Sequence, residues 1–134
     1  MSERTRAAVT EYFRRLSTGD RDSVVELFAE DVRWDIPGAT ELVPWLGSRR
    51  DRAEIREFFD QLDQGLIPGR FELERLHADG PHAVAIGRLR ATIRATGKVI
   101  DSAFTIQFEV DEDGLISEYL LLEDSWQIAN AVRP

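Results

Sequence analysis

The chain has 134 residues, of which 43% are hydrophobic and 31% charged, as is typical of one globular domain. Its 25 acidic and 17 basic residues give a net charge of −8, which argues against nucleic acid and anionic membrane surfaces as partners. The lack of cysteine excludes disulfides, thiol nucleophiles and thiolate metal sites. No apolar run has the length of a membrane span or a signal-peptide core, so we expect no membrane partner and a cytoplasmic location.

The N-terminal part of the chain predicts two helices. Four apolar side chains share the spacing of one helical face, namely Val9, Tyr12, Phe13 and Leu16. Gly19 is expected to end this helix in the left-handed conformation. Asp20 would then cap a second, short helix that carries Val24, Leu27 and Phe28.

The segment that follows predicts a strand, a loop and a third helix. Apolar and polar residues alternate over 31–36, and Pro37 and Gly38 terminate that strand. Residues 39–50 form an irregular loop that contains Trp45. Asp51 and Glu54 are placed as the capping box of a helix whose apolar face carries Ile55, Phe58, Phe59 and Leu62, and which Gly65 and Pro68 close.

The remainder predicts an antiparallel meander of four strands, at about 70–78, 82–95, 98–110 and 115–124. A two-residue turn at Thr96 and Gly97 would pair Ile93 with Ile100 and Leu89 with Phe104. The same reasoning at the next turn places Tyr119 beside Ile106, Leu121 beside Phe104 and Glu123 beside Ser102. One sheet face is then apolar and faces the helices, which gives an α+β domain.

The order of elements over residues 9–35 resembles the opening of the nuclear transport factor two-like superfamily. That superfamily includes ketosteroid isomerases, SnoaL-like polyketide cyclases and limonene-epoxide hydrolases. Tyr12, Gly19 with Asp20, residues 27–29 and Pro37 fall on matching positions of ketosteroid isomerases. The resemblance implies a single domain over residues 1–134 with a cystatin-like cone, in which three N-terminal helices pack on a curved, mainly antiparallel sheet.

The resemblance carries over one catalytic group and omits the others. Tyr12 falls on the oxyanion-donor tyrosine of ketosteroid isomerases, whereas their general base falls on Ile36 and their second oxyanion donor on Ile106. The acidic and basic ligating groups of limonene-epoxide hydrolases fall on Leu121, Gly87 and Leu89. The segments DIPG and EYLLLED look closest to SnoaL-like cyclases, but the aspartate expected near Leu121 is absent.

Three residues are therefore candidates for acid/base chemistry: Tyr12, Asp35 and Glu123. Tyr12 is either an ordinary core residue or a donor that faces a ligand. Asp35 lies one residue from the base position, at a pocket mouth or simply on the surface. Glu123 is the one carboxylate expected on the inward face, where partial burial would raise its pKa, although a solvated or helix-capping role competes.

The inward face is expected to enclose a mainly apolar cavity for a small hydrophobic or aromatic ligand. Its predicted wall comprises Trp34, Trp45, Phe58, Leu62, Leu89, Ile93, Ser102, Phe104, Ile106, Tyr119 and Leu121. The outer face carries Arg88, Arg90, Asp101 and Glu118, which predict cross-strand ion pairs, and the resemblance implies a homodimer through this face.

No cofactor is implied, and no metal site is predicted, because His77 and His82 flank a turn without a third ligand. Two functions remain open. One is a cofactor-independent isomerase or cyclase acting on a polyketide- or steroid-like compound. The other is a non-catalytic ligand-binding or accessory dimerisation domain on the same scaffold.

Overall fold

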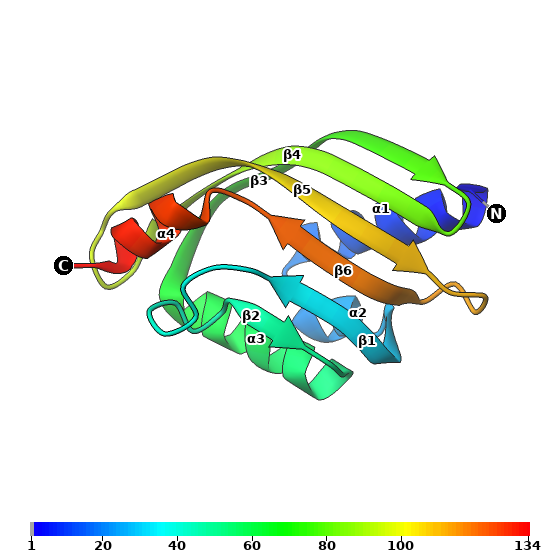
Figure 1. The fold of residues 1–134 in the computed structure, drawn as a ribbon, viewed down its shortest axis with the longest axis horizontal. Helices are drawn as coiled ribbons and strands as arrows, with labels where there is room; N and C mark the ends of the chain where they lie inside the picture. Colours follow the sequence, from blue (N-terminus) through cyan, green and yellow to red (C-terminus); the bar gives the residue numbers. More distant parts are fainter. Residues whose placement is uncertain (1) are drawn as a thin grey trace.

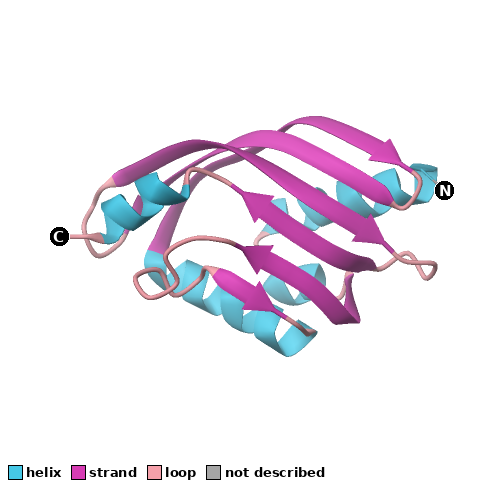
Figure 2. Cartoon of the chain, viewed as in Figure 1, coloured by secondary structure: helices cyan, strands magenta, loops and turns pink. Residues whose placement is uncertain are grey.

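The computed structural model describes residues 2–134, which form four helices and one six-stranded sheet (Figure 1). The helices are α1 (Ser2–Thr18), α2 (Arg21–Val25), α3 (Arg52–Gly65) and α4 (Ser125–Val132). The strands are β1 (Phe28–Ile36), β2 (Gly47–Arg49), β3 (Leu66–Asp79), β4 (His82–Ile93), β5 (Val99–Val110) and β6 (Ile116–Leu122). Helices α1, α2 and α3 lie together on one side of the curved sheet, as the cyan helices and magenta strands of Figure 2 show.

The predicted helix boundaries are largely confirmed. Gly19 adopts a φ of 80° at the end of α1, and the Asp20 carboxylate accepts a hydrogen bond from the Ser23 N–H at the start of α2. The Asp51 side chain accepts from the Glu54 N–H in the same way and begins α3. One prediction was wrong here: α2 ends at Val25, and Phe28 belongs to β1, because it pairs with Ile116 of β6.

The strand order β2-β1-β6-β5-β4-β3 places β1, the first strand of the chain, beside β6, the last strand. β1 and β6 run parallel, and every other neighbouring pair is antiparallel. Trp34 of β1 therefore lies opposite Tyr119 of β6. Because the two strands are neighbours, the Trp34 and Tyr119 side chains lie side by side on the inward face of the sheet.

The predicted register of β4, β5 and β6 was wrong by two residues at both hairpins. The Ile93 N–H donates to the Lys98 carbonyl, so the β4–β5 loop has four residues, and Leu89 lies opposite Ser102. In β6, Leu121 lies opposite Ile106 and Tyr119 opposite Phe108. A shift by two keeps each side chain on its predicted face, because side chains alternate along a strand.

Two elements were not predicted. Residues 47–49, assigned to an irregular loop, form the edge strand β2 through antiparallel pairing with β1. After β6, the Asp124 carboxylate accepts from the Gln127 N–H and begins α4. The Gln127 amide then bonds to both the N–H and the carbonyl of Asp101, on a part of β5 that β6 does not reach. α4 thus takes the place of a strand at this edge.

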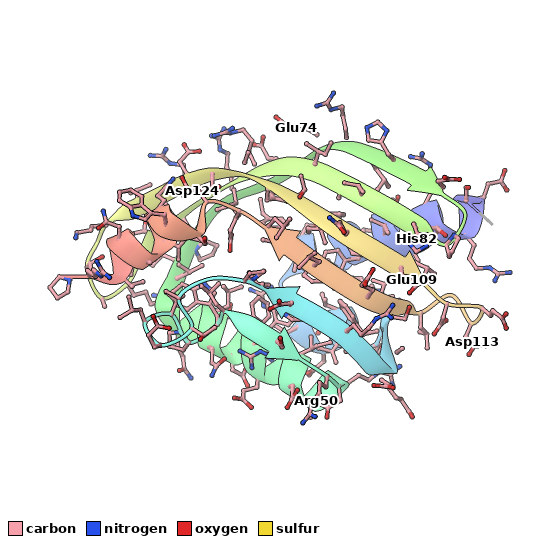
Figure 3. All side chains as sticks on the ribbon, in the orientation of Figure 1. Arg50, Glu74, His82, Glu109, Asp113 and Asp124 are labelled. Carbon is pink, nitrogen blue, oxygen red and sulfur yellow. The ribbon has the colours of Figure 1, made fainter. Side chains whose placement is uncertain are left out.

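The outer face of the sheet is polar at its centre. Arg88 and Arg90 both form ion pairs with Asp101, at 3.1 and 3.0 Å, as the alternation predicts. Charged side chains such as Glu74 and Asp113 project away from the body of the molecule in Figure 3. Among residues 2–134, no helix combines the length and apolar character needed to cross a membrane.

Candidate functional site

A cavity of about 360 Å³ lies between the helices and the inward sheet face. Its floor comes from β4, β5 and β6, and its walls come from α1, α3, the start of β3 and the loop before β2. Most residues that line it are apolar, and the polar ones are Tyr12, Ser17, Arg21, Asp63, Arg70, Arg90, Tyr119 and Glu123. Such a mixture of apolar surface and a few polar groups is typical of sites for small molecules.

Two tyrosine hydroxyls meet at this cavity. The Tyr12 and Tyr119 hydroxyl oxygens are 2.7 Å apart, and both side chains are almost fully buried. Burial raises the pKa of each phenol above its ordinary value. Both groups therefore stay protonated at neutral pH, and the pair can offer a hydroxyl proton to a ligand oxygen.

Aromatic contacts hold the tyrosine pair in place. The Trp34 ring stacks on Tyr119 with 4.0 Å between centroids and 11° between planes, and Phe28 packs edge-on against both tyrosines. Trp34 lies behind the pair and does not line the cavity. Its indole N–H is buried and has no hydrogen-bond partner among the described residues.

Glu123 brings a carboxyl group to the same cavity. It follows the last residue of β6 and precedes Asp124, the cap of α4, so the chain bends at this point. Burial raises the pKa of Glu123 from 4.5 to about 7, and within residues 2–134 its carboxylate makes no hydrogen bond or ion pair. The charge of Glu123 also raises the pKa of Tyr119, so the two groups are close enough to interact. A carboxyl group with a pKa near 7 can both accept and return a proton.

Asp35 does not reach the cavity. It pairs with Ser48 and with Leu120, in unbroken register with Trp34 and Ile36 on either side. Strand alternation therefore turns its side chain to the outer face, opposite to Trp34 and Ile36. The hypothesis of a pocket-mouth carboxylate at Asp35 is not supported by this geometry.

Six predicted wall residues line the cavity: Trp45, Phe58, Leu62, Leu89, Tyr119 and Leu121. Five others do not, because they pack in the core behind it or beyond its end: Trp34, Ile93, Ser102, Phe104 and Ile106. Ser102 accepts a hydrogen bond from the Asp124 N–H instead of facing Glu123. Sequence reasoning missed Arg21, Asp63 and Ile128, since the first two come from helix ends and the third from the unpredicted α4.

The histidine and acidic side chains of residues 2–134 do not form a metal centre. His77 and His82 are exposed at the β3–β4 turn, and no group of three or more His, Asp or Glu side chains among residues 2–134 is placed to hold an ion. Figure 3 shows His82 at the end of the sheet near the N-terminus of the chain.

The absence of a side chain at Gly65 allows the Trp45 ring to pack closely on α3 at the wall of the cavity. A Cβ atom on Gly65 would overlap the Trp45 ring, so the ring packs directly on the α3 backbone. We expect Gly65→Ala to lower the free energy of unfolding by about 1–3 kcal/mol and to displace Trp45 toward the cavity. Urea unfolding and indole fluorescence would measure both effects. Gln64→Ala, at an exposed neighbour, is the control, and Trp45→Leu in the Gly65→Ala background should recover part of the loss.

The sequence profile of the SnoaL-like domain family matches residues 9–119, from the middle of α1 to Tyr119 of β6. The chain belongs to the SnoaL-like domain family. The matched segment contains both tyrosines and ends before Glu123.

Individual relatives agree with this assignment. Patulin synthesis protein F of Aspergillus clavatus is 26% identical over 137 residues, which cover 94% of this SnoaL-like chain and 69% of that protein. The crystal structure of an NTF2-like protein of unknown function from Burkholderia pseudomallei K96243 is similar with a TM-score of 0.89, at 19% identity over 100% of both chains. TerC, crystallised with polyporic acid, has a TM-score of 0.83 at 16% identity, over 96% of this chain and 98% of TerC. At these identities the two structures establish the NTF2-like α+β fold, as the resemblance implied.

Proposed function

We propose that this SnoaL-like protein binds a small aromatic or polyketide-like compound and moves a proton on it, as a cofactor-independent isomerase or cyclase. The observation that carries the proposal is the meeting of Glu123 with the Tyr12–Tyr119 pair at one cavity. A base and an oxyanion donor on one apolar cavity are the two parts that enolisation requires.

The chemistry would run as follows. The Glu123 carboxylate takes a proton from a carbon next to a ligand carbonyl, and the electron pair moves onto the carbonyl oxygen. A tyrosine hydroxyl donates a hydrogen bond to that oxygen, which stabilises the developing charge. The protonated Glu123 then returns the proton to another carbon of the ligand. In a cyclase, the enolate carbon instead attacks a second carbonyl, the new carbon–carbon bond closes a ring, and the alkoxide formed at that carbonyl takes the proton from Glu123. The pKa of Glu123 near 7 suits both directions of transfer.

The aromatic wall supports the choice of ligand. Trp45, Phe58 and Phe71 line the cavity and would pack against a flat ring system. TerC was crystallised with polyporic acid, and Patulin synthesis protein F is named for the synthesis of patulin. Both names are compatible with compounds of this kind.

Non-catalytic binding is the second candidate function. It is favoured by the Glu123 carboxylate, which has no orienting hydrogen bond among residues 2–134, and by the position of Asp35 on the outer face. A homodimer through the outer face is part of either proposal, because Val99 and Leu122 are 48% and 41% exposed there.

Two measurements on the same compounds test these proposals. Thermal shift with polyketide-like and steroid-like ketones detects binding, because ligands of the folded state raise Tm. Proton NMR in heavy water detects exchange of protons next to the ligand carbonyl. Binding with exchange supports the enzyme, and binding without exchange supports the second candidate.

A matched pair of variants ties the result to the cavity. Ala91 lines it, whereas Ala103 is exposed on the outer face. We expect Ala91→Leu to abolish the thermal shift and Ala103→Leu to preserve it. If the folded wild-type protein neither binds nor exchanges any of the ketones, both candidate functions are wrong.

A further inference from the structure

Arg21 is a fixed cation at the cavity. Its guanidinium bonds to the Asp63 carboxylate through Nη2 at 2.7 Å and Nε at 3.3 Å, which links the start of α2 to the end of α3. The Phe59 ring lies beneath it, 4.8 Å from centroid to Cζ. The side chain is only 19% exposed, so it is held between these two partners and not free in solvent.

The other edge of this guanidinium is available to a ligand. Arginine carries five N–H donors in a rigid fork, and Asp63 occupies the edge formed by Nε and Nη2. Within the described residues, Nη1 makes no hydrogen bond, and Arg21 lines the cavity. An oxygen atom in the cavity could therefore accept from Nη1 without breaking the Asp63 pair.

Charges of opposite sign act on the two tyrosines of the cavity. The positive charge of Arg21 acts on Tyr12, where it opposes the effect of burial on the phenol pKa. The Glu123 carboxylate acts instead on Tyr119. The other charged residues of the lining are paired or exposed: Asp63 is bound to Arg21, Arg90 pairs with Asp101, and Arg70 is 58% exposed near Glu72. Arg21 and Glu123 thus act with opposite sign on the two tyrosines, which favours one orientation of a polar ligand.

We propose that Arg21 selects ligands that carry an anionic oxygen on an aromatic framework, a carboxylate, phenolate or enolate. The oxygen would accept from Arg21 Nη1, and the ring would lie against Trp45, Phe58 and Phe71. The inference rests on the proposed binding function and deepens it by naming the ligand class. It assigns Arg21 a role in specificity that does not require proton transfer.

The test compares two probes of similar size that differ in charge, 2-naphthoate and 2-naphthylmethanol, by calorimetric titration at a pH of about 6. At that pH the naphthoate is ionised, and Glu123, with a pKa of about 7, is mostly protonated. We expect the wild-type protein to bind 2-naphthoate about tenfold more tightly, because hydrogen bonds to charged groups are stronger than neutral ones. Arg21→Gln should remove this preference and leave the affinity for 2-naphthylmethanol within about twofold.

Asp63→Asn provides the complementary variant. It keeps the guanidinium and removes the neutralising charge, so we expect 2-naphthoate to bind several-fold more tightly than to the wild-type protein. This variant tests the inference even if Arg21→Gln fails to fold. Arg56→Gln is the matched control, since Arg56 pairs with Asp22 and Asp60 and does not line the cavity.

The outcomes separate this inference from the function on which it rests. Equal affinity of the wild-type protein for both probes overturns the role of Arg21 and leaves ligand binding intact. The role of Arg21 is also overturned if Arg21→Gln still binds 2-naphthoate more tightly than 2-naphthylmethanol and Asp63→Asn does not change the affinity for 2-naphthoate. Failure of both probes and of the ketones to bind overturns the proposed function itself.

Discussion

Glu123→Gln is expected to lower the rate of carbonyl-adjacent proton exchange at least about 100-fold, with ligand affinity nearly unchanged. Glutamine keeps the shape and polarity of the side chain but cannot accept the proton. Wild-type and variant rates would be compared by proton NMR at saturating ligand, so that the rate of the bound complex is measured. Glu30→Gln, at an exposed position on β1, is the matched control. Retention of the wild-type rate by Glu123→Gln would show that the base lies elsewhere.

The pH profile adds a second signature. Glu123 acts as a base only when ionised, so the wild-type exchange rate should rise with pH and level off above its pKa of about 7. The residual rate of Glu123→Gln should lack this inflection. A wild-type rate that stays flat between pH values of about 5 and 9 would contradict the assignment.

The same carboxyl group makes stability depend on pH. Burial raises the pKa of Glu123 from 4.5 to about 7, so between these values the folded state binds more protons than the unfolded state. Its contribution is therefore fully present below a pH of about 4.5 and is lost as the pH rises through about 7. The loss is about 3 kcal/mol in the free energy of unfolding. Glu123→Gln should flatten this part of the curve, and urea unfolding at several pH values would measure it.

Local signals in the sequence were sufficient to predict most element boundaries. Gly19, Asp20 and Asp51 each determine a helix end through their own backbone or side-chain bonds, without help from distant residues. The faces of β4, β5 and β6 were also predictable, because alternation survives a shift by two. Tyr119 was assigned to the inward face for this reason, Tyr12 was assigned to the core by its helical spacing, and the structure buries both.

The parts of the site that could not be predicted depend on distant contacts. The length of the β4–β5 loop sets which residues face one another, and a Thr-Gly pair alone does not determine it. Glu123 was expected beside Ser102, yet it reaches the cavity from the bend between β6 and α4, an element with no predicted counterpart. Arg21 and Asp63 are ordinary charged residues at two helix ends until the packing of α2 on α3 joins them.

Removing either tyrosine hydroxyl is expected to affect both rate and stability. Tyr12→Phe and Tyr119→Phe should each lower the exchange rate by about 100-fold or more. One variant removes the hydroxyl that donates to the ligand oxygen, and the other removes the hydroxyl that is hydrogen-bonded to this donor. Each variant also leaves the other hydroxyl without its buried partner, 2.7 Å away in the wild-type protein. Water from the cavity can take the vacated position, so the cost should be near 1 kcal/mol, at the lower end of the range for such losses.

The double variant Tyr12→Phe/Tyr119→Phe distinguishes a working pair from two independent residues. If the hydroxyls act as one unit, the double variant should be no less stable than either single variant, because it leaves no unpaired buried hydroxyl. Its exchange rate should likewise match that of the slower single variant. Urea unfolding and NMR exchange of all four proteins complete the cycle. Additive losses in both quantities would mean that the 2.7 Å contact carries no coupling and that each tyrosine acts independently of the other.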